Sequence, residues 1–272
     1  MSELVSWLKN RAQNGLLLWA DHQSAAHRFG VSYRAVEKAA LENGLLPGRY
    51  QRNRSMISLE DQLKLFRSRV AVIGCGGLGG FIIEELARLG VGQIVAVDPD
   101  VFEEHNLNRQ LLATPEFLGL KKVAAAARRI DRLNPSVDLI PVAAAFGKAN
   151  GKEILQGANV AVDGLDSIAV RLELSQVCRE EGIPMVYGSI AGWYGYVGSQ
   201  FPGEDTVEKI FSNSGTECGL EKKLGNPSFT PAVVASLEVA EVCKILLDRG
   251  TPARRRCLSI DLLDLEFVEI EC

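Results

Sequence analysis

Short runs of apolar, often β-branched residues alternate with longer amphipathic runs from residue 49 to about residue 200. Short runs of this kind predict strands, and longer runs with a helical period predict helices. The predicted strands cover residues 70–73, 94–97, 137–142, 160–162 and 185–187. The predicted helices cover residues 78–89, 121–133, 168–181 and 231–247. This alternation predicts an α/β fold with a doubly wound, mainly parallel sheet of the Rossmann-like type.

The two ends of the chain have different patterns. Residues 1–48 have a helical pattern that ends in a turn signal at Pro47-Gly48, which predicts an N-terminal helical appendage before a second domain over residues 49–272. Inside the appendage, Ala26, Gly30 and Val36 have the spacing of a helix-turn-helix. Residues 201–230 are polar and rich in glycine, which predicts a mobile loop. The alternating tail over residues 258–271 predicts antiparallel edge strands.

Composition and charge exclude several classes of protein. The 272 residues are 47% apolar and 24% charged, which is typical of a globular chain. The net charge of −4 makes a nucleic-acid partner unlikely. Residues 1–50 carry only +2, so we interpret the appendage as a structural cap or dimerisation module rather than a DNA reader. The chain has no apolar run of the roughly 18 residues that a membrane span needs, and no secretion leader, so we expect a cytoplasmic protein without a membrane partner.

A glycine-rich loop follows the first predicted strand. Gly74, Gly76 and Gly79 fit the pattern G-x-G-x-x-G, and Gly77 lies inside it. Such a loop lets a phosphate approach the backbone at a helix N-terminus. Asp98 follows the next strand, 19 residues after Gly79, where an acid accepts hydrogen bonds from ribose hydroxyls. The sequence therefore predicts nucleotide binding, and this motif alone is typical of NAD.

The residues downstream favour a triphosphate instead. They are polar or charged and follow the second and fourth predicted strands: Asp98, Asp100, Asn106, Asn108, Arg109, Gln110, Lys122 and Asp166. A nicotinamide enzyme needs an apolar nicotinamide pocket, whereas nucleotidyl transfer needs cations for phosphates and a carboxylate for Mg²⁺. We therefore expect ATP and Mg²⁺, with an NAD-dependent oxidoreductase as the disfavoured alternative.

The segment from Gly74 to Asp166, with Asn106-x-Asn108-Arg109-Gln110 and Lys122, resembles the ThiF/MoeB/HesA family of ubiquitin-activating-type adenylating enzymes. The resemblance implies that ATP adenylates the C-terminal glycine of a ubiquitin-like sulfur carrier protein that ends in Gly-Gly. It also implies roles for individual residues. Gly76 and Gly79 would line the phosphate loop, and Asp98 would hold the ribose. Asn106, Arg109 and Lys122 would bind phosphates, and Asp166 would coordinate Mg²⁺.

The resemblance further implies a homodimer, because the family uses an arginine that reaches the partner subunit's ATP. Arg49-Tyr50-Gln51-Arg52 resembles that segment, with Arg52 as the catalytic residue and Arg54 as the second choice. Adenylation of a small or tRNA-borne carboxylate, as in tRNA-modifying dehydratases, is the alternative function, since Asp166-Ser167 resembles those relatives too.

The chain departs from the family at its cysteines. Many members hold zinc with two C-x-x-C pairs; the six cysteines here form none, so we expect no zinc. Some members use a cysteine in the crossover loop for a thioester or persulfide, and Cys218 is the candidate here, with an incidental thiol as the alternative. The glycines at 188, 192, 195 and 198 would form a bare track for the carrier's tail, or else a hairpin with aromatic packing.

Each of these site residues also has a purely structural interpretation. Asp98 and Asp100 would then cap a turn, and Asn106 would close an Asx turn. Arg109 would pair with Glu103 or Glu104, and Lys122 would be a solvated helix residue. Asp166 would be a helix N-cap, and Arg52 would belong to a solvated linker.

Overall fold

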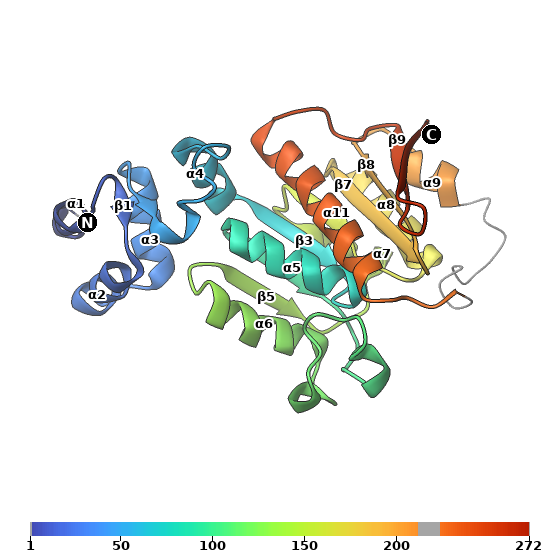
Figure 1. Cartoon of the computed structure of the whole chain (residues 1–272), viewed down its shortest axis with the longest axis horizontal. Helices are drawn as coiled ribbons and strands as arrows, with labels where there is room; N and C mark the ends of the chain where they lie inside the picture. Colours follow the sequence, from blue (N-terminus) through green and yellow to red (C-terminus); the bar gives the residue numbers. More distant parts are fainter. Residues whose placement is uncertain (1, 212–223, 272) are drawn as a thin grey trace.

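The computed structural model describes residues 2–211 and 224–271, and its centre is one twisted sheet (Figure 1). The sheet has eight strands in the order β10-β9-β8-β7-β6-β3-β4-β5 among the described residues. The strands are β3 (Arg69–Ile73), β4 (Gln93–Val97), β5 (Asp138–Val142), β6 (Val160–Asp163), β7 (Met185–Ala191), β8 (Tyr194–Gln200), β9 (Arg256–Asp261) and β10 (Glu266–Glu271). Strands β3 to β7 are parallel, and β8, β9 and β10 add antiparallel pairs. The predicted α/β fold is confirmed.

Helices cover both faces of the sheet, because the central strands are apolar on both sides. On one face, Val70, Val72 and Val162 pack with α4 (Leu59–Arg67), α5 (Gly77–Leu89), α6 (Lys122–Leu133) and α11 (Phe229–Leu247). On the other face, Ala71 and Ile73 pack with α7 (Lys148–Leu155), α8 (Ile168–Glu181) and α9 (Thr206–Phe211). Short 3₁₀ turns, η2 (Glu104–Asn106) and η3 (Pro115–Phe117), lie in the connection between β4 and α6.

The order of the strands creates a switch point beside β3. The chain runs from β3 to β4 and β5 on one side and then returns to β6 and β7 on the other side. Ligands of doubly wound sheets bind where the strand order reverses, at the carboxyl ends of the strands. The residues that follow β3, β4 and β6 are therefore placed together.

The N-terminal appendage lies at one end of the molecule (Figure 1). It contains α1 (Ser2–Arg11), β1 (Leu16–Leu17), α2 (Trp19–Phe29), α3 (Tyr33–Glu42) and β2 (Leu46–Pro47), and it has its own apolar cluster. The predicted helix-turn-helix spacing matches α2 and α3, since Ser32 caps α3 by accepting a hydrogen bond from Ala35 N–H at 3.1 Å. The 3₁₀ turn η1 (Gly48–Tyr50) leads into the rest of the chain. The domain boundary at residue 48 stays a prediction.

In the later chain one expectation needs correction, and one of two open alternatives is favoured. Residues 201–230 are not simply a loop, since α9 lies within them and α11 begins at Phe229. The glycines after residue 187 belong to the β7–β8 hairpin and serve packing. A Cβ at Gly195 would lie 2.4 Å from Cγ2 of Val234, and one at Gly188 would lie 2.5 Å from the carboxyl carbon of Glu238. At these two positions the bare backbone admits α11, which supports the hairpin alternative over an open track. No helix in the described part of the chain is long and apolar enough to cross a membrane.

Candidate functional site

A cavity of about 880 Å³ lies at the switch point, over the carboxyl ends of the parallel strands. Its floor is the glycine-rich loop between β3 and α5. A Cβ at Gly79 would lie 1.8 Å from the carbonyl oxygen of Gly74, and Gly74 itself has a φ of +98°. Both positions therefore require glycine. Gly76 and Gly77 line the cavity where α5 begins, so a helix N-terminus faces the space in which a phosphate would bind.

The carboxylate of Asp98 fastens this loop to β4. It accepts hydrogen bonds from the backbone N–H groups of Cys75 and Asp100, each at 2.8 Å. The turn-capping interpretation is therefore correct for Asp98. Asp98 and Asp100 also line the cavity, so a ribose contact is compatible with the cap.

Lys122 is the first residue of α6, and its side chain is only 9% exposed. Its ammonium group lies 3.0 Å from the carboxylate of Asp100 and 3.9 Å from that of Asp98. The solvated-residue interpretation is therefore wrong for Lys122. The side chain of Asp100 is 64% exposed, so this ion pair is open to exchange with an incoming phosphate.

Two more predicted residues line the cavity from the crossover segment after β4. Arg109 donates to the carbonyl oxygen of His105 at 3.1 Å and to Oδ1 of Asn108 at 2.9 Å. Within the described ranges it forms no ion pair, so the predicted pairing with Glu103 or Glu104 is wrong. Gln110 is buried, and its Oε1 has no hydrogen-bond partner in the described part of the chain. Both side chains thus have hydrogen-bonding capacity left for a ligand.

Asn106 and Asn108 support the crossover segment from outside the cavity. Oδ1 of Asn106 accepts a hydrogen bond from Glu103 N–H at 2.9 Å, which is the Asx-turn alternative. Asn108 donates to the carbonyl oxygen of Asn226 at 3.2 Å. Neither residue lines the cavity, and the phosphate contact of Asn106 stays a prediction.

Asp166 fits a divalent cation. It is exposed, lines the cavity after β6, and has no hydrogen bond or ion pair to any described residue. The N-cap of α8 is its neighbour Ser167, whose Oγ accepts from Val170 N–H at 3.5 Å. The capping interpretation of Asp166 is therefore wrong. A free carboxylate next to a phosphate site is the kind of ligand that Mg²⁺ uses together with phosphate oxygens.

Sequence reasoning missed a buried charge cluster under the cavity. Nε of Arg171 lies 2.5 Å from Oδ2 of Asp163, and Nη2 donates to the carbonyl oxygens of Leu165 at 3.0 Å and Gly188 at 2.8 Å. Burial raises the pKa of Asp163, although Arg171 opposes the shift. Burial, with Asp163 nearby, raises the pKa of Glu238 well above its usual value. One signal was available, because Arg171 shares a helix face with Leu174 and Cys178, which are buried.

Arg52 and Cys218 do not line the cavity as the structure describes it. Arg52 is exposed and lies in the turns between η1 and α4. Its neighbour Tyr50 packs on Gly90, just after the end of α5, whereas the cavity lies at the start of that helix. The 13 residues of α5 separate the two places by about 20 Å. Cys218 lies outside the described residues.

Comparisons with known proteins agree with this architecture. The sequence model of the ThiF family matches residues 50–272. SAMP-activating enzyme E1 of Haloferax volcanii is 37% identical over 226 residues, which cover 80% of this chain and 83% of that protein. Adenylyltransferase and sulfurtransferase MOCS3 of Arabidopsis thaliana is 31% identical over 242 residues, which cover 86% of this chain and 52% of that longer protein.

Among solved structures, E. coli MccB with ATP superimposes with a TM-score of 0.67 at 20% identity, covering 99% of this chain and 86% of that one. At this identity the similarity concerns the fold. The sequence relationships carry the assignment, and they confirm the resemblance found from the motifs. The chain therefore belongs to the ThiF family of adenylyltransferases.

Proposed function

We propose that this chain uses ATP and Mg²⁺ to adenylate the C-terminal glycine of a ubiquitin-like sulfur carrier protein. One observation carries the proposal. The switch-point cavity brings together the glycine-rich N-terminus of α5, the cationic side chains of Arg109 and Lys122, and the carboxylate of Asp166. A triphosphate and its metal need this combination, and a nicotinamide ring does not. The names of the relatives, which include an activating enzyme and an adenylyltransferase, agree with it.

The residues of the cavity divide the work of nucleotidyl transfer. Backbone N–H groups at Gly76 and Gly77 donate hydrogen bonds to phosphate oxygens, and the carboxylate of Asp98 accepts hydrogen bonds from the ribose. Arg109 and Lys122 neutralise charge on the phosphates, and Lys122 exchanges its bond to Asp100 for a phosphate oxygen. Asp166 would hold Mg²⁺, which would supply further positive charge to the triphosphate.

The reaction itself needs little covalent help from the protein. A carboxylate oxygen of the carrier's last glycine attacks the α-phosphorus, the bond from that phosphorus to the bridging β-phosphate oxygen breaks, and pyrophosphate leaves. The product is a mixed anhydride of the carrier and AMP. Positioning and charge neutralisation supply most of the rate, because the reacting atoms must lie in line. Adenylation requires no thiol, so Cys218 belongs to a later step if it acts at all.

The carrier has a surface to bind beside the cavity. Tyr194, Tyr196, Val268 and Ile270 share one face of β8 and β10 and are 41%, 41%, 53% and 42% exposed. Three of them, Tyr194, Tyr196 and Ile270, also line the cavity. An exposed apolar face of this kind marks a protein interface. A carrier that covers it is placed to extend its Gly-Gly tail into the cavity.

The active unit in this proposal is a homodimer in which Arg52 acts on the partner's nucleotide. Arg52 lies near the C-terminal end of α5, about 20 Å from its own cavity at the start of that helix, so in this proposal it serves the cavity of the partner subunit. The described cysteines Cys75, Cys178 and Cys243 are free thiols, which agrees with a reducing compartment such as the cytoplasm.

Exchange of labelled pyrophosphate into ATP tests the proposal. With a purified ubiquitin-like protein that ends in Gly-Gly, we expect exchange that requires Mg²⁺. The same protein without its last glycine should support none, because the attacking carboxylate is displaced by one residue. Calorimetry measures the binding of ATP·Mg²⁺ and of NAD. Tight binding of NAD without binding of ATP would overturn the proposal.

A further inference from the structure

The phenol of Tyr50 joins the appendage to the nucleotide-binding part of the chain. Its hydroxyl donates to Oε1 of Glu37 at 2.9 Å and accepts from Nδ2 of Asn134 at 2.9 Å. The three side chains are at most 1% exposed. Glu37 belongs to α3 of the appendage, whereas Asn134 ends α6, whose first residue is Lys122.

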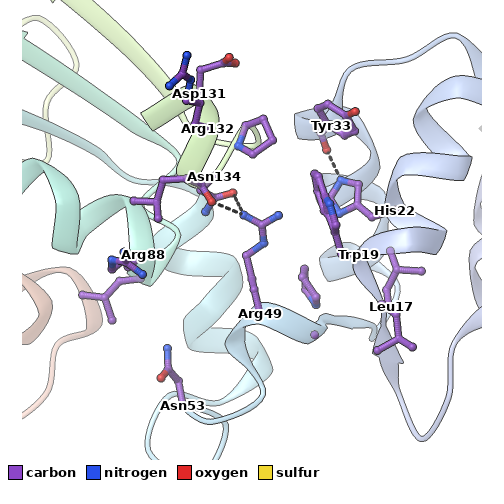
Figure 2. Close-up of a pocket in the computed structure, with 16 residues that line it drawn as sticks. Leu17, Trp19, His22, Tyr33, Arg49, Asn53, Arg88, Asp131, Arg132 and Asn134 are labelled. Carbon is purple, nitrogen blue, oxygen red and sulfur yellow. Dashed lines mark hydrogen bonds between the residues drawn. The ribbon is translucent and has the colours of Figure 1, made fainter. Parts of the chain in front are cut away.

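Asn134 also fixes the residue before Tyr50. Its Oδ1 accepts a hydrogen bond from Nη1 of Arg49 at 2.5 Å, and its Nδ2 donates to the carbonyl oxygen of Ala87 at 2.9 Å. Figure 2 shows Arg49 reaching across the cleft between the appendage and the rest of the chain. On the appendage side, the guanidinium of Arg49 lies 4.8 Å from the centroid of the Trp19 ring. Residues 49 and 50 are thus held from both sides.

Arg52 follows two residues later, in a backbone that is fixed at both ends. Asn53 N–H donates to the carbonyl oxygen of Tyr50 at 2.9 Å, and Ile57 N–H donates to that of Asn53 at 2.8 Å. The far end is held by Arg249, which donates to the carbonyl oxygen of Met56 at 2.6 Å. The exposed Arg52 is therefore carried on an ordered turn.

Burying the polar side chains of Glu37, Tyr50 and Asn134 costs free energy, so stability alone does not explain this cluster. The carboxyl group of Glu37 is fully buried, and burial raises its pKa. Apolar side chains of similar size would fill this space at lower cost. Hydrogen bonds of fixed direction give instead a defined position, which a group acting at a distance requires.

We propose that Tyr50, held by Glu37 and Asn134, is a positioning residue that presents Arg52 to the partner subunit's nucleotide. The appendage supplies Glu37 and Trp19 for this purpose, which gives it a role in the reaction. The inference rests on the proposed function, because it assumes that Arg52 acts in trans.

The first test compares turnover of single variants. Tyr50→Phe removes the hydroxyl that holds both partners, so turnover should fall about tenfold while calorimetric binding of ATP·Mg²⁺ stays near wild type. Glu37→Gln keeps an acceptor for the hydroxyl and should retain most turnover, whereas Glu37→Leu should not. Ser199→Ala is the matched control, since it removes another buried hydrogen bond, from β8 to Glu241 of α11 at 3.0 Å, which involves no residue of the turn that carries Arg52. Unchanged turnover in Tyr50→Phe, or an equal loss in Ser199→Ala, would overturn the inference.

The second test asks which subunit's site Tyr50 serves. Subunits are mixed by unfolding and co-refolding, and native mass spectrometry confirms the mixed dimers. Tyr50→Phe mixed with Asp166→Ala should recover activity, because one site of each mixed dimer has an intact Asp166 and receives a well-placed Arg52. Tyr50→Phe mixed with Arg52→Ala should not rise above the residual turnover of the Tyr50→Phe parent, because both lesions affect the same delivered group.

The opposite pattern contradicts the inference. If Tyr50 supported its own subunit's site, the mixture with Arg52→Ala would recover and the mixture with Asp166→Ala would not. The mixture of Arg52→Ala with Asp166→Ala tests the proposed function separately. Recovery there shows action in trans, so a wrong pattern for Tyr50 alone refutes only the inference, whereas no recovery there refutes the trans assignment of Arg52 itself.

Discussion

The guanidinium of Arg171 lies 2.5 Å from the carboxylate of Asp163, and both side chains are buried beneath the nucleotide cavity. Because Arg171 also binds the carbonyl oxygens of Leu165 and Gly188, it ties the loop after β6 to β7. Asp166 lies in that loop, so the buried pair fixes the place from which the free carboxylate enters the cavity.

Removing the cation of this pair should destabilise the protein strongly. Arg171→Met leaves Asp163 buried and unpaired, so we expect a loss of about 3–5 kcal/mol in the free energy of unfolding, measured in urea. Lys152→Ala is the control, since its ion pair with Glu181 is exposed on the lysine side and such pairs contribute at most about 1 kcal/mol. Equal losses in the two variants would show that Arg171 does not compensate a buried charge.

Glu238 should make the protein less stable as the pH rises. Its folded pKa is raised above the unfolded value, so its contribution is fully present below the unfolded pKa and is lost as the pH rises through the folded pKa. Glu238→Gln cannot ionise. Its unfolding free energy should therefore exceed that of wild type by an amount that grows above about pH 4.5. Urea unfolding across this range measures the difference, and Glu266→Gln, at an exposed position, serves as control. Parallel curves for Glu238→Gln and wild type would contradict the expectation.

Asp166 and Ser167 are neighbours with separable roles. Asp166→Asn should abolish Mg²⁺-dependent pyrophosphate exchange and leave the melting temperature near that of wild type, because its carboxylate has no described partner in the fold. Ser167→Ala should do the reverse. It removes the N-cap of α8, which costs about 1 kcal/mol of stability, and it should retain exchange. If both variants lost the same property, the division between metal ligand and cap would be wrong.

The two faces of β10 should differ in their importance for the carrier. Val268 lies in one row with Ser259 and Tyr196, on the face that continues into the cavity, and Phe267 lies on the opposite face. Val268→Asp should raise the KM for the carrier at least about tenfold without changing ATP affinity, since it places a charge in an apolar contact. Phe267→Asp should leave the KM close to wild type. An equal effect of both changes on the KM would indicate a general disturbance of the strand.

The sequence was sufficient for the central sheet and the glycine-rich loop, because both rest on local patterns. Val70 and Val162 lie in short apolar runs that are typical of buried parallel strands, and Gly74 lies where a side chain would collide with the loop after β6. The helix face that Arg171 shares with buried residues indicated its burial, but the sequence could not show that Asp163 is its partner. Nor could it decide between a ligand and an Asx turn for Asn106, since both use the same side-chain oxygen.

Helix α6 begins with Lys122 in the cavity and ends beside Asn134 at the appendage. The length of its 12 residues therefore fixes the distance between these two contacts. Each residue added to an α-helix advances the chain by about 1.5 Å and rotates it by about 100°. A single insertion would therefore turn Asn134 away from Tyr50, or turn Lys122 away from Asp100, even if every other side chain were kept. For protein engineering, this makes the number of residues in α6 as important as their identity, and grafting the appendage onto another member of the fold requires a helix of equal length.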